Sequence, residues 1–441
     1  MTTTPAPRSS TAVNDTSPDR GPASAGPPAS RRTMLALGLG NTLEWYDWMV
    51  FGLLAAYLGP QFFAPQDPVS ATLDTLAVFA VGFVMRPLGG VILGNVADRV
   101  GRRRVMLLSI SLMAVTTLAI AVMPTYDTIG VWAGVLLLVS RILQGVSTGI
   151  EAPLSTAYAV ELNPAGHEGR AAGYISFFVN FGILLASLVS FLTSYFIGGD
   201  TMSEWGWRVP MLFGAVMGFF VLYLRRTLPE TLHEEEKAEE NAGTWGGVRK
   251  HWIGLVAMIF VVGGAQAYNY AWNVGLPNLA RSSFGEDPTE IFAATTALGV
   301  ILLVGSIITG RLADRITLSK TFIGTRLLAI PSVFMMLLYA GPGLTTFTVV
   351  LLVGGLFLVA NMTLYNVVST SLMPKYCRAT GTSLGYGVAV AAFGGTASYL
   401  LVWLQSISQI WVFPAYTAAL AAVSVVLYVI ARRKSGIFAG K

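Results

Sequence analysis

The sequence predicts an all-α membrane protein with twelve transmembrane helices, arranged as two six-helix repeats. Hydrophobic residues make up 54% of the 441 positions and charged residues only 12%, whereas a soluble domain carries about 25% charged residues. This composition excludes a soluble enzyme, a nucleic-acid-binding module and a disordered protein. The apolar residues fall into twelve stretches, each near the length of about 20 residues that crosses a membrane.

The twelve stretches are flanked by polar segments, which set the expected domain boundaries. Residues 1–33 are rich in Thr, Ser, Ala, Pro and Gly, so we expect a disordered tail. The N-terminal bundle, 34–226, holds the spans 34–58, 73–96, 104–123, 129–152, 171–196 and 207–226. A charged linker, 227–250, precedes the C-terminal bundle, 251–432. That bundle holds the spans 252–280, 290–312, 320–340, 345–372, 379–405 and 409–431, and a short tail follows at 433–441.

The distribution of Lys and Arg predicts the orientation in the membrane. Basic residues gather in the loops on one side, and these include Arg99, Arg102, Arg103, Arg104, Arg170, Arg249, Lys250, Arg315 and Arg378. The opposite loops carry Asp67, Asp127, Asp200, Glu286 and Asp287. Since the positive side of a membrane protein faces the cytoplasm, we expect a multi-pass protein of the cell membrane with both termini in the cytoplasm.

A loop motif occurs twice, once in each half. Gly94-Asn-Val-Ala-Asp98-Arg99 lies between spans two and three, and Gly310-Arg-Leu-Ala-Asp314-Arg315 lies between spans eight and nine. In the same way, Arg170 follows span four and Arg378 follows span ten. This layout is typical of a transporter built from parallel repeats.

Several motifs together resemble a known family. The loop from Gly94 to Arg104 is similar to the signature of the major facilitator superfamily. Four further motifs, GNTLEWYDW, RPLGG, RILQG and YAVELNPAGHEGR, resemble its metabolite:proton symporters, and GFVMRPLGG and GGTASYL look like bacterial α-ketoglutarate permeases. The resemblance implies two six-helix bundles that rock about a central site, with helices one, four, seven and ten lining the cavity.

Two carboxylates in the first span are candidates for proton coupling. Glu44 and Asp47 are spaced i, i+3 and so share a helix face. A charge inside the bilayer costs at least about 2.5–3.5 kcal/mol, and two neighbouring carboxylates favour retention of a proton on one of them. The alternative is a structural ion pair of either carboxylate with Arg86 or Arg141.

The candidate substrate-binding residues come from both halves. Arg141 lies about 18 Å into span four, with Gln144 one turn on, and this pairing suits a carboxylate ligand. Arg86 is similarly deep, while Arg326 lies nearer the cytoplasmic end of its span. The polar residues of spans seven and ten complete the expected cavity wall, or else form interhelical hydrogen bonds: Tyr268, Asn269, Trp272, Asn361 and Tyr365.

The loop motifs are expected to form a conformational gate, as the resemblance implies. Asp98 at a helix end can bond the start of a neighbouring helix, and the arginines can answer carboxylates at span ends. The alternative is simple anchoring of the positive loops. The predicted gate residues are Asp98, Arg102, Glu151, Glu161, Arg170, Asp314 and Arg378.

These observations predict a proton-coupled symporter that imports a small polar metabolite, with an organic acid such as α-ketoglutarate as the first choice. A zwitterionic osmolyte such as proline or betaine, a shikimate-like acid, or export by proton antiport are the alternatives. The Gly145-to-Gly149 segment matches a hydrolase pattern but lies within an apolar helix, so we expect no enzyme. We also expect no metal or other cofactor, no nucleic-acid partner and a monomer in the lipid bilayer, with the proton gradient as the energy source.

Overall fold

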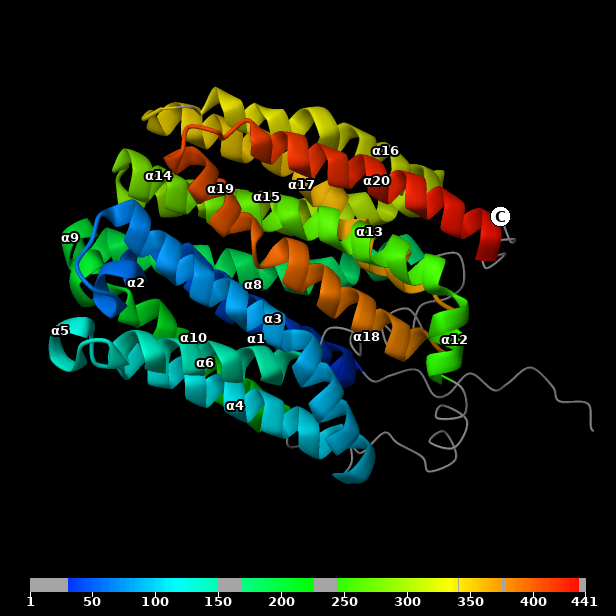
Figure 1. The fold of residues 1–441 in the computed structure, drawn as a ribbon, viewed down its shortest axis with the longest axis horizontal. Coiled ribbons are helices and arrows are strands. Elements are labelled where there is room, and N and C mark those ends of the chain that lie inside the picture. The colour runs from blue at the N-terminus through cyan, green and yellow to red at the C-terminus, as the bar shows by residue number, and fades with distance from the viewer. Residues whose placement is uncertain are drawn as a thin grey trace, which may run out of the picture.

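The computed structural model describes residues 31–100, 102–149, 168–225, 244–339, 341–374 and 377–435. Every regular element in these ranges is a helix, and the long helices run side by side along the molecule (Figure 1). Most helices of the N-terminal half lie in the lower part of this view, and most of those of the C-terminal half lie in the upper part. The helices thus form two bundles, one from each half of the chain, that pack side by side.

The helices of the N-terminal half follow the first six expected spans. They are α1 (Arg31–Leu53), α2 (Ala55–Phe62), α3 (Pro68–Val100), α4 (Arg102–Val122), α5 (Tyr126–Ile129), α6 (Trp132–Thr148), α8 (Glu168–Ile197), α9 (Gly199–Thr201), η1 (Met202–Gly206) and α10 (Arg208–Arg225). α1 begins at Arg31, just inside the expected disordered tail.

The helices of the C-terminal half follow the other six expected spans. They are α12 (Thr244–Lys250), α13 (Trp252–Tyr270), η2 (Ala271–Gly275), α14 (Leu276–Phe284), α15 (Pro288–Ile316), α16 (Leu318–Val333), η3 (Phe334–Leu338), α17 (Leu344–Ser371), α18 (Arg378–Ala389), η5 (Val390–Gly394), α19 (Ala397–Ser406) and α20 (Val412–Ser435). α12 lies in the expected linker, and α20 extends a few residues into the expected tail.

The lengths and composition of the helices fit a membrane protein. Within the described ranges, nine helices are long and apolar enough to cross a membrane, and the bent pair Gly199–Gly206 and Arg208–Leu224 makes a tenth. α6 is apolar but shorter, and α1, which carries Glu44 and Asp47, occupies the first expected span. These helices together account for the twelve spans.

Four expected spans are interrupted. The first breaks at Leu54, between α1 and α2, two others contain the π-helical turns η2 and η5, and the span 320–340 changes from α16 to the 3-10 helix η3. A π-turn inserts one residue into the helical register without changing the polarity of the segment. Hydrophobic patterning therefore predicted continuous helices at these places.

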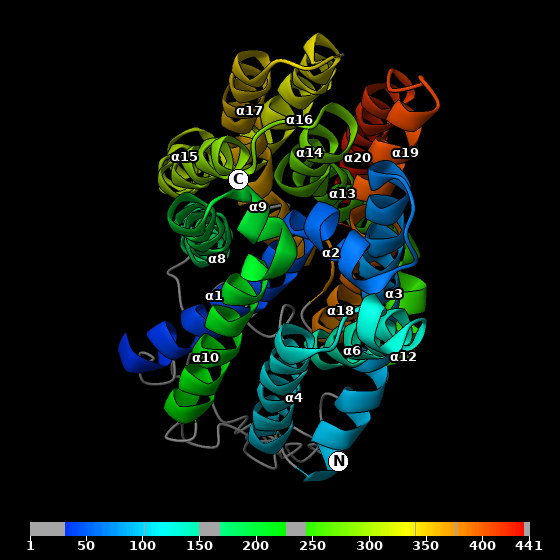
Figure 2. The ribbon, with the colours of Figure 1, turned by 90° about the vertical axis from the view of Figure 1, so that its left-hand side faces the viewer.

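The two halves meet at several pairs of helices, and two of these pairs show close contacts at glycine. α8 packs against α15 (Figure 2), where a Cβ atom on Gly169 would collide with the carbonyl oxygen of Gly310. α3 packs against α18, and a Cβ atom on Gly387 would lie 3.2 Å from the Pro87 side chain. Glycine at these contacts permits the close approach of the helices.

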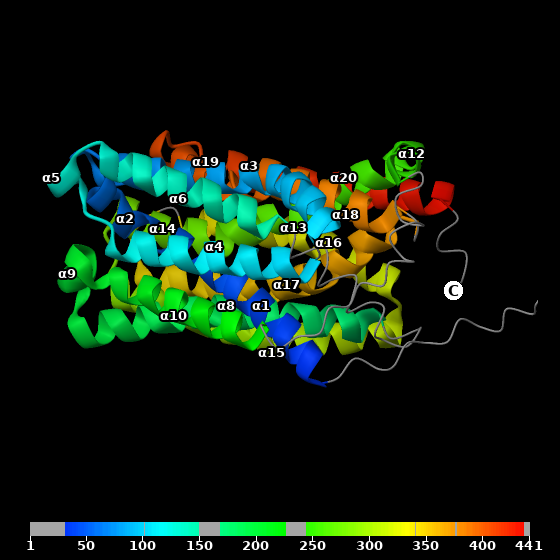
Figure 3. The same ribbon diagram turned by 90° about the horizontal axis from the view of Figure 1, so that it is seen from below.

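The two ends of the molecule differ in charge. We call one end the basic end, defined by Arg170, Arg249, Lys250, Arg315 and Arg378, and the other the acidic end, defined by Asp67, Asp127, Asp200, Glu286 and Asp287. Figure 3 shows α5 and α9 at the acidic end and α12 with the C-terminus at the basic end. Residues midway between the ends form the candidate site.

Candidate functional site at the centre of the helical bundle

Two buried ion pairs connect α1 to its neighbours. Nη1 of Arg86, from α3, lies 3.3 Å from Oε1 of Glu44, and Nη1 of Arg141, from α6, lies 3.5 Å from Oδ2 of Asp47. All four side chains are at most 5% exposed. Each carboxylate of the i, i+3 pair therefore faces its own arginine. The sequence had left open which of the two carboxylates pairs with which arginine.

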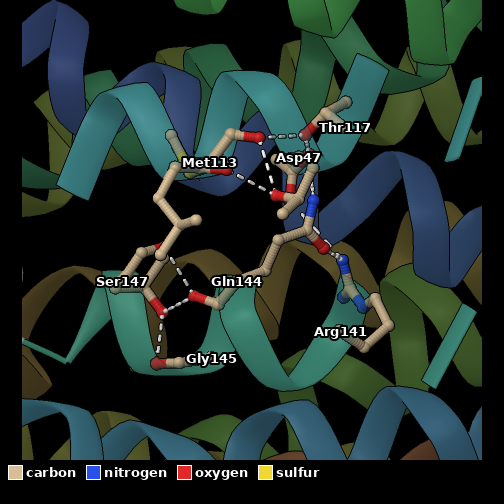
Figure 4. Close-up of polar contacts among 10 residues, drawn as sticks. Asp47, Met113, Thr117, Arg141, Gln144, Gly145 and Ser147 are labelled. Atoms are coloured by element: carbon tan, nitrogen blue, oxygen red, sulfur yellow. Dashed lines mark hydrogen bonds and ion pairs between the residues drawn. The ribbon is translucent and has the colours of Figure 1, made fainter. Parts of the chain in front are cut away.

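Asp47 is the centre of a hydrogen-bonded cluster (Figure 4). The hydroxyl of Thr117, from α4, donates to Oδ1 of Asp47. Nε2 of Gln144 donates to the same oxygen at 3.3 Å and to the Thr117 hydroxyl at 2.9 Å, while Arg141 donates to Oε1 of Gln144. Thr117 was not predicted as a site residue, because a threonine in an apolar span is ordinary; the Thr116-Thr117 pair was its only signal.

Close packing of α3 on α6 brings the two arginines together. A Cβ atom on Gly145 would collide with the carbonyl oxygen of Gly82, and one on Gly149 would collide with that of Arg86. The small-residue spacing on α6 thus serves helix packing, as expected from the sequence, and the Ser147 hydroxyl between the two glycines donates to the carbonyl oxygen of Gln144 at 2.8 Å.

Aromatic rings cover the guanidinium groups. The Arg86 and Arg141 guanidinium carbons lie 4.1 Å and 4.3 Å from the Trp48 ring centre, and Arg141 lies 4.0 Å from that of Phe51. Such cation–π contacts stabilise a desolvated cation. Nε and Nη2 of Arg141 have no hydrogen-bond partner. These two donors share one edge of the guanidinium and leave it able to bind a carboxylate.

Polar residues of the C-terminal half approach the same centre. Gln266 of α13 donates to the Tyr365 hydroxyl of α17 at 2.8 Å, and Asn269 donates to Gln266 at 3.5 Å. Tyr386 of α18 interacts with the side chains of both Tyr365 and Arg86. The sequence did not identify Tyr386, which links the polar residues of α17 to the Arg86–Glu44 pair.

Two aromatic residues of span seven, Tyr268 and Trp272, point elsewhere. The Tyr268 hydroxyl donates to the carbonyl oxygen of Gly354 at 2.9 Å, and Nε1 of Trp272 donates to that of Leu351 at 3.2 Å. Both acceptors belong to α17, so these side chains lie within the C-terminal half. Their contacts match the alternative interpretation, interhelical hydrogen bonding. In contrast, neither side-chain polar atom of Asn361 has a hydrogen-bond partner, although the residue is only 1% exposed.

A polar contact closes the basic end between the halves. Oδ1 of Asp314, at the end of α15, accepts a hydrogen bond from the backbone N–H of Gly169 at 2.7 Å, and Oδ2 lies 3.3 Å from Nε of Arg170. Asp314 thus binds the start of α8, the arrangement expected for this loop motif. Nε of Arg378 donates to the carbonyl oxygen of Met373 at 3.2 Å.

The remaining predicted gate residues come from the first loop motif and from the segment after α6. Asp98 and Arg102 lie at the facing ends of α3 and α4. Glu151 and Glu161 lie outside the described residues.

A second polar contact closes the acidic end, and the sequence did not predict it. Asn278 of α14 donates to the carbonyl oxygen of Gly52 at 2.7 Å and accepts from the backbone N–H of Ala56 at 2.8 Å. These two backbone groups flank the break at Leu54 between α1 and α2. Polar contacts between the halves are therefore present toward both ends of the molecule.

Comparison with known proteins gives the family and the fold. The family model described as Major Facilitator Superfamily matches residues 37–399. The alpha-ketoglutarate permease of Escherichia coli is 33% identical over 90% of this chain and 92% of its own, and the citrate-proton symporter of Salmonella typhi is 31% identical over 90% and 94%. A putative proline/betaine transporter of Staphylococcus haemolyticus is 32% identical over 91% of this chain and 86% of its own.

A solved structure has the same helical arrangement. The proton:xylose symporter XylE bound to 6-bromo-6-deoxy-D-glucose matches with a TM-score of 0.69 at 18% identity, over 93% of this chain and 95% of its own. This likeness, with the family match, confirms the predicted helical membrane fold. Among the described residues, no group of three or more His, Cys, Asp or Glu side chains could hold a metal ion.

Proposed function

Because this chain belongs to the Major Facilitator Superfamily, we propose that it imports an organic acid together with protons, by alternating access through the central site. It is a multi-pass membrane transporter and not an enzyme, in keeping with its family and relatives. A carboxylate group is common to α-ketoglutarate, citrate, proline and betaine, the compounds in the names of the relatives. The buried Arg141–Asp47 pair is the observation that carries the proposal.

Charge balance explains how this pair couples the acid to a proton. With Asp47 ionised, the pair is neutral and Arg141 has its counter-ion at 3.5 Å. A second carboxylate on Arg141 would add an uncompensated negative charge in a buried site, which is costly. When Asp47 takes up a proton, Arg141 loses its counter-ion, and binding of the acid's carboxylate restores neutrality. Proton and acid therefore bind together.

The hydrogen bonds around Asp47 suit this exchange. Gln144 and Thr117 supply hydrogen bonds to Asp47 from outside the ion pair. Both can reorient, because an amide and a hydroxyl each donate and accept. The free Nε and Nη2 donors of Arg141 supply a fork for the substrate carboxylate. Thr117 and Gln144 can thus hydrogen-bond to Asp47 whether its carboxyl group is ionised or protonated.

The second ion pair has a positioning role in this proposal. Arg86 and Glu44 lie beside Tyr386 of the C-terminal half. The Arg86–Glu44 pair can therefore transmit the state of the central site to α18. Tyr365 and Gln266 complete the side of the site formed by the C-terminal half.

Alternating access would use the two contacts between the halves. Breaking the Asp314–Gly169 bond opens the basic end, and breaking the Asn278 bonds opens the acidic end. We assign the basic end, with both termini, to the cytoplasm because basic loops stay inside. We also propose that one chain suffices, since both halves of the site come from it.

A zwitterionic osmolyte is the second candidate, because an aromatic cluster adjoins the Arg86–Glu44 pair. The rings of Trp45 and Tyr270 stack with centres 6.2 Å apart, and Phe83 lies 5.0 Å from Tyr270. Aromatic faces bind quaternary ammonium groups. Such a ligand would place its carboxylate on Arg141 and its cationic group against these rings.

Proteoliposomes with an internal pH dye test the proposal. Organic acids, betaine and proline are added outside one at a time, and empty liposomes give the background. We expect a keto- or dicarboxylate to acidify the lumen. If only betaine or proline acidifies the lumen, the substrate is a zwitterionic osmolyte and not an organic acid. If no compound drives protons inward and an outward gradient expels one, the import direction is wrong.

A further inference from the structure

The middle of the C-terminal half holds a buried cation, Arg326, that forms no ion pair with any residue that the structure describes. Arg326 lies within α16, is 0% exposed, and is about 12 Å from the start of this helix at 1.5 Å per residue. Residues 251–441 contain only four carboxylate side chains: Glu286, Asp287, Glu290 and Asp314. The first three lie at or near the acidic end, and Asp314 lies at the basic end of α15. None of them is at the depth of Arg326.

The contacts of Arg326 leave most of its charge uncompensated. Its Nη2 donates to the backbone carbonyl oxygen of Val261, and its guanidinium lies 5.3 Å from the Phe322 ring centre. Nε and Nη1 have no hydrogen-bond partner. The two arginines of the N-terminal half, in contrast, each face a carboxylate. Burial of a charge without an opposite charge is costly, so an anion is the missing partner.

Polar groups near Arg326 fit an anionic ligand. Tyr365 lies close enough to interact electrostatically with Arg326, and Gln266 donates to its hydroxyl. Asn361 lies one turn before Tyr365 on α17, and both of its side-chain polar atoms lack a hydrogen-bond partner. Two buried side chains with unused donors therefore lie on neighbouring helices, α16 and α17.

We infer that Arg326, with Asn361 and Tyr365, forms an anion subsite in the C-terminal half that binds a carboxylate group of the transported acid. This inference rests on the proposed function. Tyr365 and Tyr386 connect the subsite to Arg86 of the N-terminal half. In this inference, an acid with two carboxylates binds Arg141 through one of them and Arg326 through the other. A zwitterion with a single carboxylate cannot satisfy both arginines, so the subsite favours dicarboxylates.

Ligand-induced thermal shifts of the purified full chain in detergent test the subsite. The probes are α-ketoglutarate, acetate, betaine and chloride, with methanesulfonate, which has no carboxylate, as the counter-anion in chloride-free buffer. The variants are Arg326→Gln, Arg326→Lys and Asn361→Ala. Lys320→Gln is the matched control, because Lys320 is an exposed cation on the same helix.

The inference predicts opposite effects on binding and on folding. In Arg326→Gln, the α-ketoglutarate concentration for half-maximal shift rises by about ten- to a hundredfold, while the melting temperature without ligand stays equal or increases. Arg326→Lys and Asn361→Ala give intermediate losses, and Lys320→Gln behaves as wild type.

Three results would overturn the inference. An equal α-ketoglutarate response of Arg326→Gln and wild type removes Arg326 from ligand binding while leaving the proposed function intact. A chloride shift lost in Arg326→Gln, with the acid response unchanged, assigns the subsite to an inorganic anion instead. If wild type responds to no acid, the proposed function fails and the subsite fails with it.

Discussion

The Arg141 guanidinium lies 3.5 Å from the Asp47 carboxylate in a fully buried position, and Gln144 hydrogen-bonds to both residues. This relationship links the group that can take up a proton to the group that can bind an anion. Protonation of Asp47 removes the negative charge that faces Arg141, and because both side chains are buried, Arg141 is then left without its counter-ion. The proposed coupling of proton and acid rests on this pairing.

Glu44→Gln should destabilise the protein, because it leaves Arg86 buried without its carboxylate. Breaking a buried ion pair from one side costs about 3–5 kcal/mol. Thermal unfolding in detergent should show this loss of stability. The double variant Arg86→Met/Glu44→Leu should recover most of the lost stability, but it should not transport the acid. Equal melting temperatures of Glu44→Gln and wild type would contradict the assigned pair.

Asp314→Ala should loosen the basic end, because the start of α8 loses the acceptor of the Gly169 N–H. Hydrogen–deuterium exchange should become faster at Gly169–Ala172. Arg170→Gln is the control: this arginine's side chain is 61% exposed, and an exposed ion pair contributes only about 0–1 kcal/mol. Exchange that rises equally in both variants would assign the closure to the ion pair rather than to the helix start.

Asn278→Leu should loosen the acidic end. The substitution removes the hydrogen bonds of the Asn278 side chain to the backbone of Gly52 and Ala56. The backbone around Leu54 then loses both of these hydrogen bonds to the other half. Faster exchange of the Ala56 amide, without a change at Gly169, is the expected pattern. Unchanged exchange at Ala56 would show that packing alone closes this end.

The pKa of the Cys377 thiol predicts how its labelling depends on pH. Burial raises this pKa, and nearby Arg378 lowers it by a smaller amount. The thiolate is the reactive form, so maleimide labelling of the native protein should rise at higher pH than labelling of free cysteine. Any stability gained from the neutral thiol is present below the ordinary thiol pKa and is lost as pH rises through the folded-state pKa.

The variant Arg378→Gln gives a second test of the pKa of the Cys377 thiol. Loss of the guanidinium should move the labelling profile to still higher pH, and unfolding in detergent should return it to that of free cysteine. A profile that moves to lower pH in this variant would contradict the assigned causes. Cys377 is the only cysteine in the chain, so the label reports a single position.

The sequence predicted the spans and most of the charged residues of the site. A charged residue within a long apolar segment can be recognised from one amino-acid sequence alone. The sequence could not predict which carboxylate faces which arginine, since this depends on the rotation of α1 against α3 and α6. The roles of Thr117, Asn278 and Tyr386 were missed for the same reason. Each is an ordinary polar residue until folding brings it beside Asp47, the Leu54 break or Arg86.

The sequence also placed Tyr268 and Trp272 with the substrate-binding residues, on the basis of residue type and shared helix face. Their hydrogen bonds to Gly354 and Leu351 instead favour a packing role. The π-turn η2, which begins at Ala271, changes the helical register within this segment. Helical periodicity alone could not show which face of α13 meets α17.

Uptake of radiolabelled acid by proteoliposomes that contain Asp47→Asn tests the central claim most directly. The matched control is Asp67→Asn, which changes an exposed carboxylate at the acidic end. We predict that Asp47→Asn still exchanges internal for external acid but neither accumulates acid nor moves protons under a pH gradient, while the control does both. Gradient-driven accumulation with proton uptake by Asp47→Asn would show that the coupling proton binds elsewhere.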